Sequence, residues 1–360
     1  MAKPNFSTLV LESLELESGV VLRHVEVAYQ TWGTLNESAD NAVVVFHSMT
    51  GDSEATSWWG SLVGPDRAIN TDTNFVICAN LLGSCYGTSG PTSVNPATGE
   101  TYKASFPACT VRDQVRLHQA LVGILGVRQV RCVVGGSLGG FMALEWAVMD
   151  PNISEVIAVA TSGRHSAWCI AWTEAQRQAI YSDPNWNNGY YEDGTQPEAG
   201  LATARMMAMM SYRNPASFTA RFGRQQAATD STPIYAVESY LRYQGQKLVN
   251  RFDANSYVRL TQTSNSHDLA RGRGDYFDVL RSISSRVLVV GVDTDILFPL
   301  QEQRELASGI PNATLEVIPS EHGHDGFLLE GESLNRIVKN WLSLHTNQPN
   351  QIDYQIASCV

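Results

Sequence analysis

A serine enclosed by glycines, in the segment GGSLGG at residues 135–140, is the feature that most restricts how this chain can fold. The mostly apolar residues 129–134 before it favour a strand, and residues 138–149 after it favour a helix. In so tight a turn the serine backbone is strained and side chains two residues away would collide, so Gly135 and Gly139 are needed. The arrangement is typical of a nucleophile elbow, which raises Ser137 at the C-terminal edge of a sheet. The alternatives are a glycine-rich turn that only allows close packing and a turn that binds phosphate.

Short β-branched runs alternate with helical patterns on both sides of this turn. Most runs are almost continuously apolar, as expected of strands that are covered on both faces. A helix is predicted over residues 110–126, with Thr110 as N-cap and Asp113 three residues later. The alternation predicts an α/β fold with a mostly parallel sheet flanked by helices. The predicted strands cover residues 42–47, 74–80, 129–134, 155–160, 286–291 and 314–318.

The alternation of strands and helices stops after residue 160 and resumes near residue 286. The segment between is rich in Arg, Met, Ala, Gln, Trp and Tyr, and residues 200–212 strongly favour a helix. We therefore predict an α/β core domain interrupted by a helical lid domain and followed by a loose tail. The core is expected to comprise residues 1–162 and 281–346, the lid residues 163–280 and the tail residues 347–360.

The composition argues against several classes of function. A formal net charge of −11 opposes non-specific binding to nucleic acid or to acidic membrane surfaces. The N-terminus lacks the apolar core of a signal peptide, and no stretch reaches the roughly 18 apolar residues that span a bilayer. The six cysteines form no C-x-x-C pair, so no metal or redox motif is expected. We expect a cytoplasmic protein whose ligands are small molecules, with no metal site.

A serine hydroxyl is a weak nucleophile unless a base accepts its proton. In enzymes with a nucleophile elbow, the partners follow in the chain order Ser, Asp or Glu, His. Asp293 and Asp295 follow the fifth predicted strand, and His322 and His324 follow the sixth. The residue pattern alone leaves both choices open.

The developing negative charge on a carbonyl under attack needs backbone N–H donors, usually one after the nucleophile and one after an early strand. Leu138 directly follows the serine, and Met49 follows the first predicted strand. These two N–H groups are the candidate oxyanion hole. The alternative for the loop around Met49 is a plain turn.

Several long motifs together resemble the homoserine O-acetyltransferase family, whose fold is that of the α/β hydrolases. The resemblance extends over about residues 8–345, and the motifs follow the order of the family. It implies an α/β-hydrolase fold with a helical lid insertion. The motifs are HSMTGDSEATSWW, NLLGSCYGTSGPTSVNPATGETY, FPACTVRDQV, GGSLGGFMALEWA, SYLRYQGQKLVNRFDANSYVRLT, DTDILFP and GHDGFL.

The family pattern implies that the acid is Asp295, in TDILFP, and that the base is His324, in HDGFL. With Ser137, these residues would form the catalytic triad.

The resemblance also implies four substrate-binding residues. Arg205 matches the arginine that contacts the substrate carboxylate, and Asp325 matches the residue that holds the amino group. Tyr212 matches the active-site tyrosine and lies two helical turns after Arg205, on the same face. Thr50 matches the threonine that lines the pocket. Without the resemblance, each of these three residues has a plainer alternative interpretation. Arg205 would be a solvated charge, Tyr212 a core residue and Asp325 a helix cap.

The implied activity is CoA-dependent O-acyl transfer by a ping-pong route through an acyl-serine. Acetyl-CoA is the expected donor and co-substrate, without a permanently bound cofactor, and L-homoserine the expected acceptor, in methionine biosynthesis. A homodimer through the lid is expected. The alternatives are serine O-acetyltransferase or O-succinyltransferase activity in cysteine biosynthesis, an esterase or thioesterase, and a catalytically silent binding module. Five arginines are candidates for the CoA phosphates, namely Arg164, Arg177, Arg213, Arg221 and Arg224.

Overall fold

An eight-stranded sheet runs through the structure, a computed structural model in which residues 6–227 and 233–346 are described. Its strand order is β1-β2-β6-β3-β7-β8-β11-β12. The neighbours from β6 onward run parallel, whereas β2 is antiparallel to both β1 and β6. The predicted mostly parallel sheet is therefore confirmed. The strands are β1 (Ser7–Glu15), β2 (Val21–Trp32), β3 (Ala42–Phe46), β6 (Phe75–Ala79), β7 (Val130–Gly136), β8 (Glu155–Val159), β11 (Arg286–Val292) and β12 (Ala313–Ile318).

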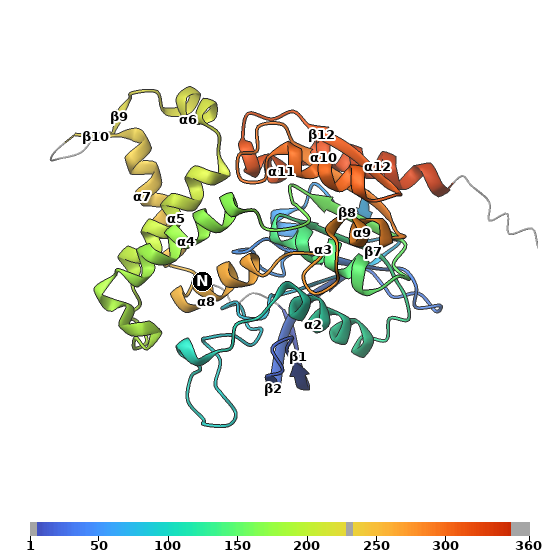
Figure 1. The fold of residues 1–360 in the computed structure, drawn as a ribbon, viewed down its shortest axis with the longest axis horizontal. Helices are drawn as coiled ribbons and strands as arrows, with labels where there is room; N and C mark the ends of the chain where they lie inside the picture. Colours follow the sequence, from blue (N-terminus) through green and yellow to red (C-terminus); the bar gives the residue numbers. More distant parts are fainter. Residues whose placement is uncertain (1–5, 228–232, 347–360) are drawn as a thin grey trace, which may run out of the picture.

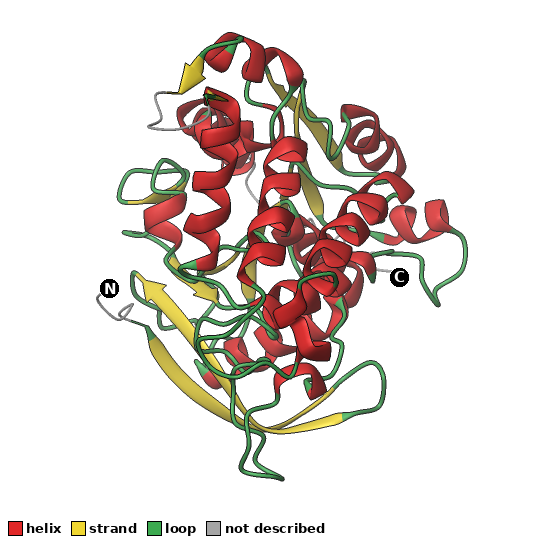
Figure 2. Ribbon diagram, turned by 90° about the vertical axis from the view of Figure 1, so that its left-hand side faces the viewer, coloured by secondary structure: helices red, strands yellow, loops and turns green. Residues whose placement is uncertain are grey.

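Both faces of the sheet are buried, which explains why the central strands are apolar throughout. Along β3, Val44 and Phe46 belong to one buried cluster, whereas Val43 and Val45 belong to another on the opposite face. The first cluster includes side chains of α2 (Val111–Ile124), α3 (Leu138–Met149) and α10 (Leu300–Gly309). The second includes side chains of α1 (Ala55–Trp58), α11 (Gly326–Leu329) and α12 (Gly331–Thr346). Figure 2 shows the helices and the strongly twisted sheet from the side.

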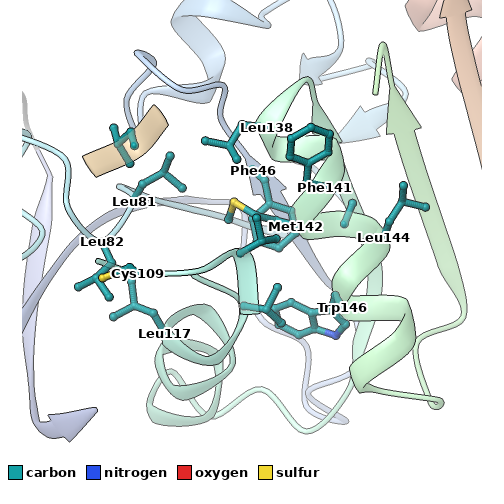
Figure 3. Close-up of a cluster of buried hydrophobic side chains, with 14 of the residues drawn as sticks. Phe46, Leu81, Leu82, Cys109, Leu117, Leu138, Phe141, Met142, Leu144 and Trp146 are labelled. Carbon is teal, nitrogen blue, oxygen red and sulfur yellow. The ribbon is translucent and has the colours of Figure 1, made fainter. Parts of the chain in front are cut away.

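The helix after the serine is packed deeply into the first cluster. Figure 3 shows Phe141, Met142 and Trp146 of α3 beside Phe46 of β3 and Leu117 of α2. All of these side chains are buried. Packing of this kind fixes the helix N-terminus, and with it the turn that carries Ser137.

The predicted capping box at Thr110 is confirmed. The side chain of Thr110 accepts a hydrogen bond from the backbone N–H of Asp113, and the carboxylate of Asp113 accepts one from the backbone N–H of Thr110. The antiparallel hairpin of β1 and β2 is an addition to the predicted elements. It extends the sheet at the edge beside β6.

A mostly helical region separates β8 from β11. In Figure 1, its helices α4 to α7 lie together to the left of the sheet. The region lies where the helical lid is expected, and α9 at its end packs against α10 of the core. The predicted tail at residues 347–360 lies outside the described residues. The helices are α4 (Ala167–Tyr181), α5 (Glu198–Tyr212), α6 (Pro215–Phe222), α7 (Ala236–Val249), α8 (Ala254–Asn265) and α9 (Tyr276–Ser282).

Within the described part of the chain, no helix combines the length and the apolar character that crossing a membrane requires.

Candidate active site

The turn after β7 holds Ser137 in a strained conformation. Its φ is 58° and its ψ is −124°, a backbone geometry that side-chain-bearing residues rarely adopt and that costs about 1–3 kcal/mol. Two hydrogen bonds of 2.9 Å hold the residue there, since Ser137 N–H donates to Val159 O and Thr161 Oγ1 donates to Ser137 O. This strained turn holds Ser137 between the end of β7 and the first residue of α3.

The glycines around the serine are needed because other chain segments come too close for a side chain. A Cβ on Gly135 would overlap the backbone of Gly139, and a Cβ on Gly139 would overlap the carbonyl of Phe46. The predicted requirement for glycine at both positions is confirmed. The other two glycines are equally restricted, since Gly136 faces the Phe327 ring and Gly140 faces Thr161.

The structure joins His324 to Asp295. The Nδ1 atom of His324 lies 2.7 Å from Oδ2 of Asp295, and both side chains are buried. The other carboxylate oxygen accepts hydrogen bonds of 2.8 and 2.9 Å from the N–H groups of Leu297 and Phe298. The carboxylate is therefore fixed, and it orients the imidazole with Nδ1 as the proton-bearing nitrogen.

The competing residues have other partners. Asp293 accepts a hydrogen bond of 2.9 Å from the backbone N–H of Ser320. His322 Nδ1 lies 3.4 Å from the guanidinium of Arg213. Each of these side chains lies in the same loop as its competitor but contacts a different group.

One cavity of about 570 Å³ brings most of the candidate residues together. A second, much smaller cavity of about 40 Å³ lies on another side of the serine, and Leu138 lines it. Ser137, Met49 and Tyr212 line both. Among the candidates, the larger cavity, called the main cavity below, is lined by Met49, Thr50, Ser137, Arg205, Tyr212, His324 and Asp325.

The two candidate oxyanion donors have no acceptor among the described residues. Neither the N–H of Met49 nor that of Leu138 is engaged in a backbone or side-chain hydrogen bond. Leu138 is the first residue of α3, where a helix leaves its N–H groups free and carries partial positive charge. Both N–H groups are thus available to a ligand.

The sequence comparisons identify the family. The model of the α/β hydrolase fold matches residues 41–330. The homoserine O-acetyltransferase of Trichormus variabilis is 55% identical over 336 residues, covering 92% of this chain and 93% of that protein. The chain belongs to the homoserine O-acetyltransferase family.

Solved structures agree with this assignment. The homoserine O-acetyltransferase from Bacillus anthracis has a TM-score of 0.88 at 26% identity, covering 94% of this chain and 97% of that chain. Esterase E22 has a TM-score of 0.85 at 26% identity, covering 94% and 99%. The predicted α/β-hydrolase fold and the resemblance to the homoserine O-acetyltransferase family are confirmed.

The polar residues matched to the family carry opposite charges in the main cavity. The Arg205 guanidinium lies 5.4 Å from the centre of the Tyr212 ring, which shows that the two share a face of α5. No carboxylate in the described chain lies within ion-pair distance of Arg205. Asp325, in contrast, is paired with Arg213 at 3.0 Å. Burial raises the pKa of Asp325, although the charges of Arg213, His324 and Arg205 oppose that shift.

Two cations in the main cavity were missed by the sequence analysis. Lys247 on α7 and Arg251 just after it both line the cavity. Arg251 donates a hydrogen bond of 2.8 Å to the carbonyl of Thr50 and another to the hydroxyl of Tyr86. Both cations lie in the long motif at residues 239–261, and this motif is the sequence feature from which they could have been identified.

The five arginines suggested for the CoA phosphates do not line the main cavity, and the suggestion that they meet CoA at its mouth stays a prediction. Their guanidinium groups are occupied elsewhere. Arg177 is 7% exposed and pairs with Glu174, and Arg213 pairs with Asp325. The other three contact Glu305 and Tyr276 (Arg164), Tyr240 (Arg221) and Tyr235 (Arg224).

Among the residues that the structure describes, no three His, Cys, Asp or Glu side chains are grouped in a way that would hold a metal ion.

Proposed function

We propose that this chain transfers the acetyl group of acetyl-CoA to the hydroxyl of L-homoserine, as in methionine biosynthesis. The observation that carries the proposal is the content of the main cavity. It contains a serine on an elbow and a histidine held by a buried aspartate, together with the unpaired cation of Arg205 and the carboxylate of Asp325. Charges of opposite sign beside a nucleophile suit a zwitterionic amino acid, because burying each of its ends requires a counter-charge.

In the first half-reaction, Ser137 attacks the thioester carbonyl while His324 accepts the hydroxyl proton. The N–H groups of Met49 and Leu138 hold the oxyanion, and loss of one such donor typically costs about 100- to 1,000-fold in rate. The carbon–sulfur bond then breaks, and the thiolate of CoA leaves with the proton from His324. Asp295 stabilises the imidazolium that forms in between.

In the second half-reaction, the hydroxyl of homoserine gives its proton to His324 and attacks the acetyl-serine carbonyl. The ester bond to Ser137 breaks, and the serine oxygen recovers the proton from His324. Arg205 holds the carboxylate of the acceptor and Asp325 its ammonium group. The fixed acceptor competes with water because its hydroxyl is held beside the reacting carbon.

The small cavity beside the serine suits an acetyl group. Its lining includes Leu138, Phe141, Leu297 and Phe298, and no lysine or arginine takes part in it. A succinyl group is larger and would bring a carboxylate into this space without a cation to meet it. The size and charge of the cavity therefore favour an acetyl donor over a succinyl donor.

Hydrolysis is the second candidate function, since an esterase shares this fold at a TM-score of 0.85. The same triad would form the acyl-serine, and water would take the place of the amino acid. The helical region argues for transfer, because Arg205 and Tyr212 of α5 line the main cavity together with Ser137. An esterase acting on uncharged acyl groups has no need of Arg205.

The decisive experiment measures CoA release by the purified protein with acetyl-CoA or succinyl-CoA. Each donor is combined with L-homoserine, with L-serine and with no acceptor, and S137A is the matched control. We expect release that requires acetyl-CoA and homoserine together and that disappears in S137A. Release that ignores the acceptor would show a hydrolase, and release only with serine would show the alternative acceptor.

We also propose a cytoplasmic homodimer that pairs through the helical region. Large apolar side chains are exposed there, among them Trp168 of α4, Met210 of α5 and Tyr243 of α7. Apolar side chains gathered on one region of a surface favour an interface. Light scattering after gel filtration would give the mass, and a monomer at micromolar concentration would contradict this part of the proposal.

A further inference from the structure

His47 is a fully buried histidine that the mechanism above does not use. It follows the last residue of β3 and precedes the loop that carries Met49. Both ring nitrogens have partners, with Nδ1 2.8 Å from the carbonyl oxygen of Ser48 and Nε2 3.3 Å from the backbone nitrogen of Leu81. A backbone N–H can only donate, so Nε2 accepts from Leu81 and Nδ1 carries the proton that is donated to Ser48. Burial lowers the pKa of His47, in keeping with a neutral ring.

The carbonyl that His47 holds belongs to the same peptide unit as the N–H of Met49. A trans peptide is planar, and its C=O and N–H point in opposite directions. The described chain contains no cis peptide. A second donor, the N–H of Gly51, reaches the same oxygen at 2.9 Å. Fixing the Ser48 oxygen from two sides therefore fixes the direction of the Met49 N–H.

That N–H has no acceptor among the described residues, and Met49 lines both cavities that contain Ser137. We propose that His47 is a positioning residue, whose Nδ1–H holds the Ser48 carbonyl so that the Met49 N–H is directed at the oxyanion formed on the acyl group. The proposal rests on the proposed function, in which Ser137 is the nucleophile. The proposal gives the two hydrogen bonds of the His47 ring different roles. The bond from Nδ1 to Ser48 serves catalysis, whereas the bond from the Leu81 N–H to Nε2 holds the chain after β6.

Two amide substitutions separate these bonds. The amide nitrogen of asparagine lies as many bonds from Cα as Nδ1, so H47N keeps a donor for Ser48 and loses the acceptor for Leu81. The amide oxygen of glutamine lies as many bonds from Cα as Nε2, so H47Q keeps the acceptor for Leu81 and loses the donor for Ser48. Each variant lacks one buried hydrogen bond, and both are measured beside the wild type.

We expect H47Q to lower kcat about 10- to 100-fold, a part of what complete loss of an oxyanion donor costs, with both KM values nearly unchanged. H47N should keep kcat within about threefold of the wild type, although its unpaired Leu81 N–H lowers its melting temperature. The burst of p-nitrophenol from p-nitrophenyl acetate should be slowed in H47Q alone, since acylation needs the same donor. A purely structural role predicts instead that kcat follows stability and that H47N is the weaker enzyme.

The outcomes separate this inference from the proposed function. If the wild type fails to transfer acetyl groups, the proposed function is wrong. If the wild type is active and H47Q matches it, or H47N loses as much kcat as H47Q, the positioning role is wrong.

Gly51→Ala tests the same geometry without changing the buried ring. A Cβ at Gly51 would lie 3.2 Å from the Cβ and Nδ1 of His47 and from the Ser48 oxygen, so it would press directly on this contact. We expect kcat to fall severalfold with KM unchanged. A kcat equal to that of the wild type would show that the direction of this peptide does not limit the reaction, even if both substitutions of His47 prevented folding.

Discussion

The main cavity has two walls that are built in different ways. The wall from the α/β core carries the reacting groups, with Ser137 in its strained turn and His324 held by the buried Asp295. The wall from the helical region presents long charged side chains, Arg205, Lys247 and Arg251, on helices or just after them. The difference indicates that the core supplies the acyl chemistry and Asp325 for the acceptor, while the helical region supplies the cations for the acceptor and donor.

The largest expected effect comes from the core wall, in Asp295→Asn. Without the carboxylate the imidazole loses its orientation, and kcat should fall about 1,000- to 10,000-fold while KM for homoserine changes little. Steady-state CoA release measures both constants. Asp293→Asn is the matched control, because it lies two residues away and its carboxylate accepts from the N–H of Ser320 instead of from His324. Equal losses in the two variants would contradict the assignment of Asp295 to the triad.

On the helical wall, Arg205→Ala should weaken binding of the acceptor homoserine and leave acylation of Ser137 intact. Loss of a charged hydrogen-bonding partner costs about 2–3 kcal/mol, so kcat/KM for homoserine should fall about 30- to 150-fold. The burst with p-nitrophenyl acetate should stay close to that of the wild type. Arg242→Ala, at an exposed arginine of α7 that pairs with Glu238, serves as the control. A slowed burst in R205A would contradict the assignment of acylation to the core wall and of acceptor binding to Arg205.

Asp325 should make the KM for homoserine depend on pH. Burial raises its pKa, so its carboxylate takes up a proton at a higher pH than an ordinary aspartate. The protonated form cannot pair with an ammonium group, and KM for homoserine should therefore rise as the pH falls. Asp325→Asn should raise this KM about 10-fold or more and remove this pH dependence. A KM that varies equally with pH in both proteins would argue against contact with the acceptor.

A smaller effect is expected at Lys247, an exposed side chain at the main cavity. No ion pair engages it within the described part of the chain, so it is free to meet the phosphates of CoA. Exposed pairs contribute about 0.5–1 kcal/mol, and Lys247→Ala should raise KM for acetyl-CoA about two- to fivefold. The difference should shrink in high salt because exposed charges are screened. A change in KM for homoserine instead would place Lys247 at the acceptor.

The smallest effect on catalysis is expected at Glu17, which lines neither of the two cavities at Ser137. Burial alone would raise its pKa, but hydrogen bonds from Arg271 and Thr110 and the charges of Arg112 and Arg271 lower it to about 2. A lowered pKa stabilises the fold above the ordinary value of 4.5, and the contribution disappears as the pH falls from 4.5 towards 2. Because the group is partly exposed, Glu17→Gln should cost only about 1 kcal/mol at pH 7. Thermal melts at several pH values would show it, with kcat unchanged.

How well the sequence predicted the site residues differs between the two walls of the main cavity. The elbow was readable because the collision at Gly135 involves Gly139, four residues away, and the predicted strand and helix flank the turn. The choice between Asp293 and Asp295 was not readable from the residue pattern. Both follow the same strand, and only the packed loop shows which carboxylate reaches His324. The partners of arginines in the helical region were harder still to predict, since Arg213 and Arg251 contact residues 112 and 201 positions away in the chain.

By itself, the sequence determined the α/β alternation, the capped helix at Thr110 and the strained serine between glycines. These features depend on side-chain periodicity, local hydrogen bonds and backbone sterics, which act within a few residues. The tertiary structure alone decided that Asp325 pairs with Arg213, that Arg251 donates to the Thr50 carbonyl and that Asp295 reaches His324. Those outcomes depend on which surfaces pack together and which polar atoms are left to find partners there, because a buried polar group takes whatever donor or acceptor the packing brings within reach.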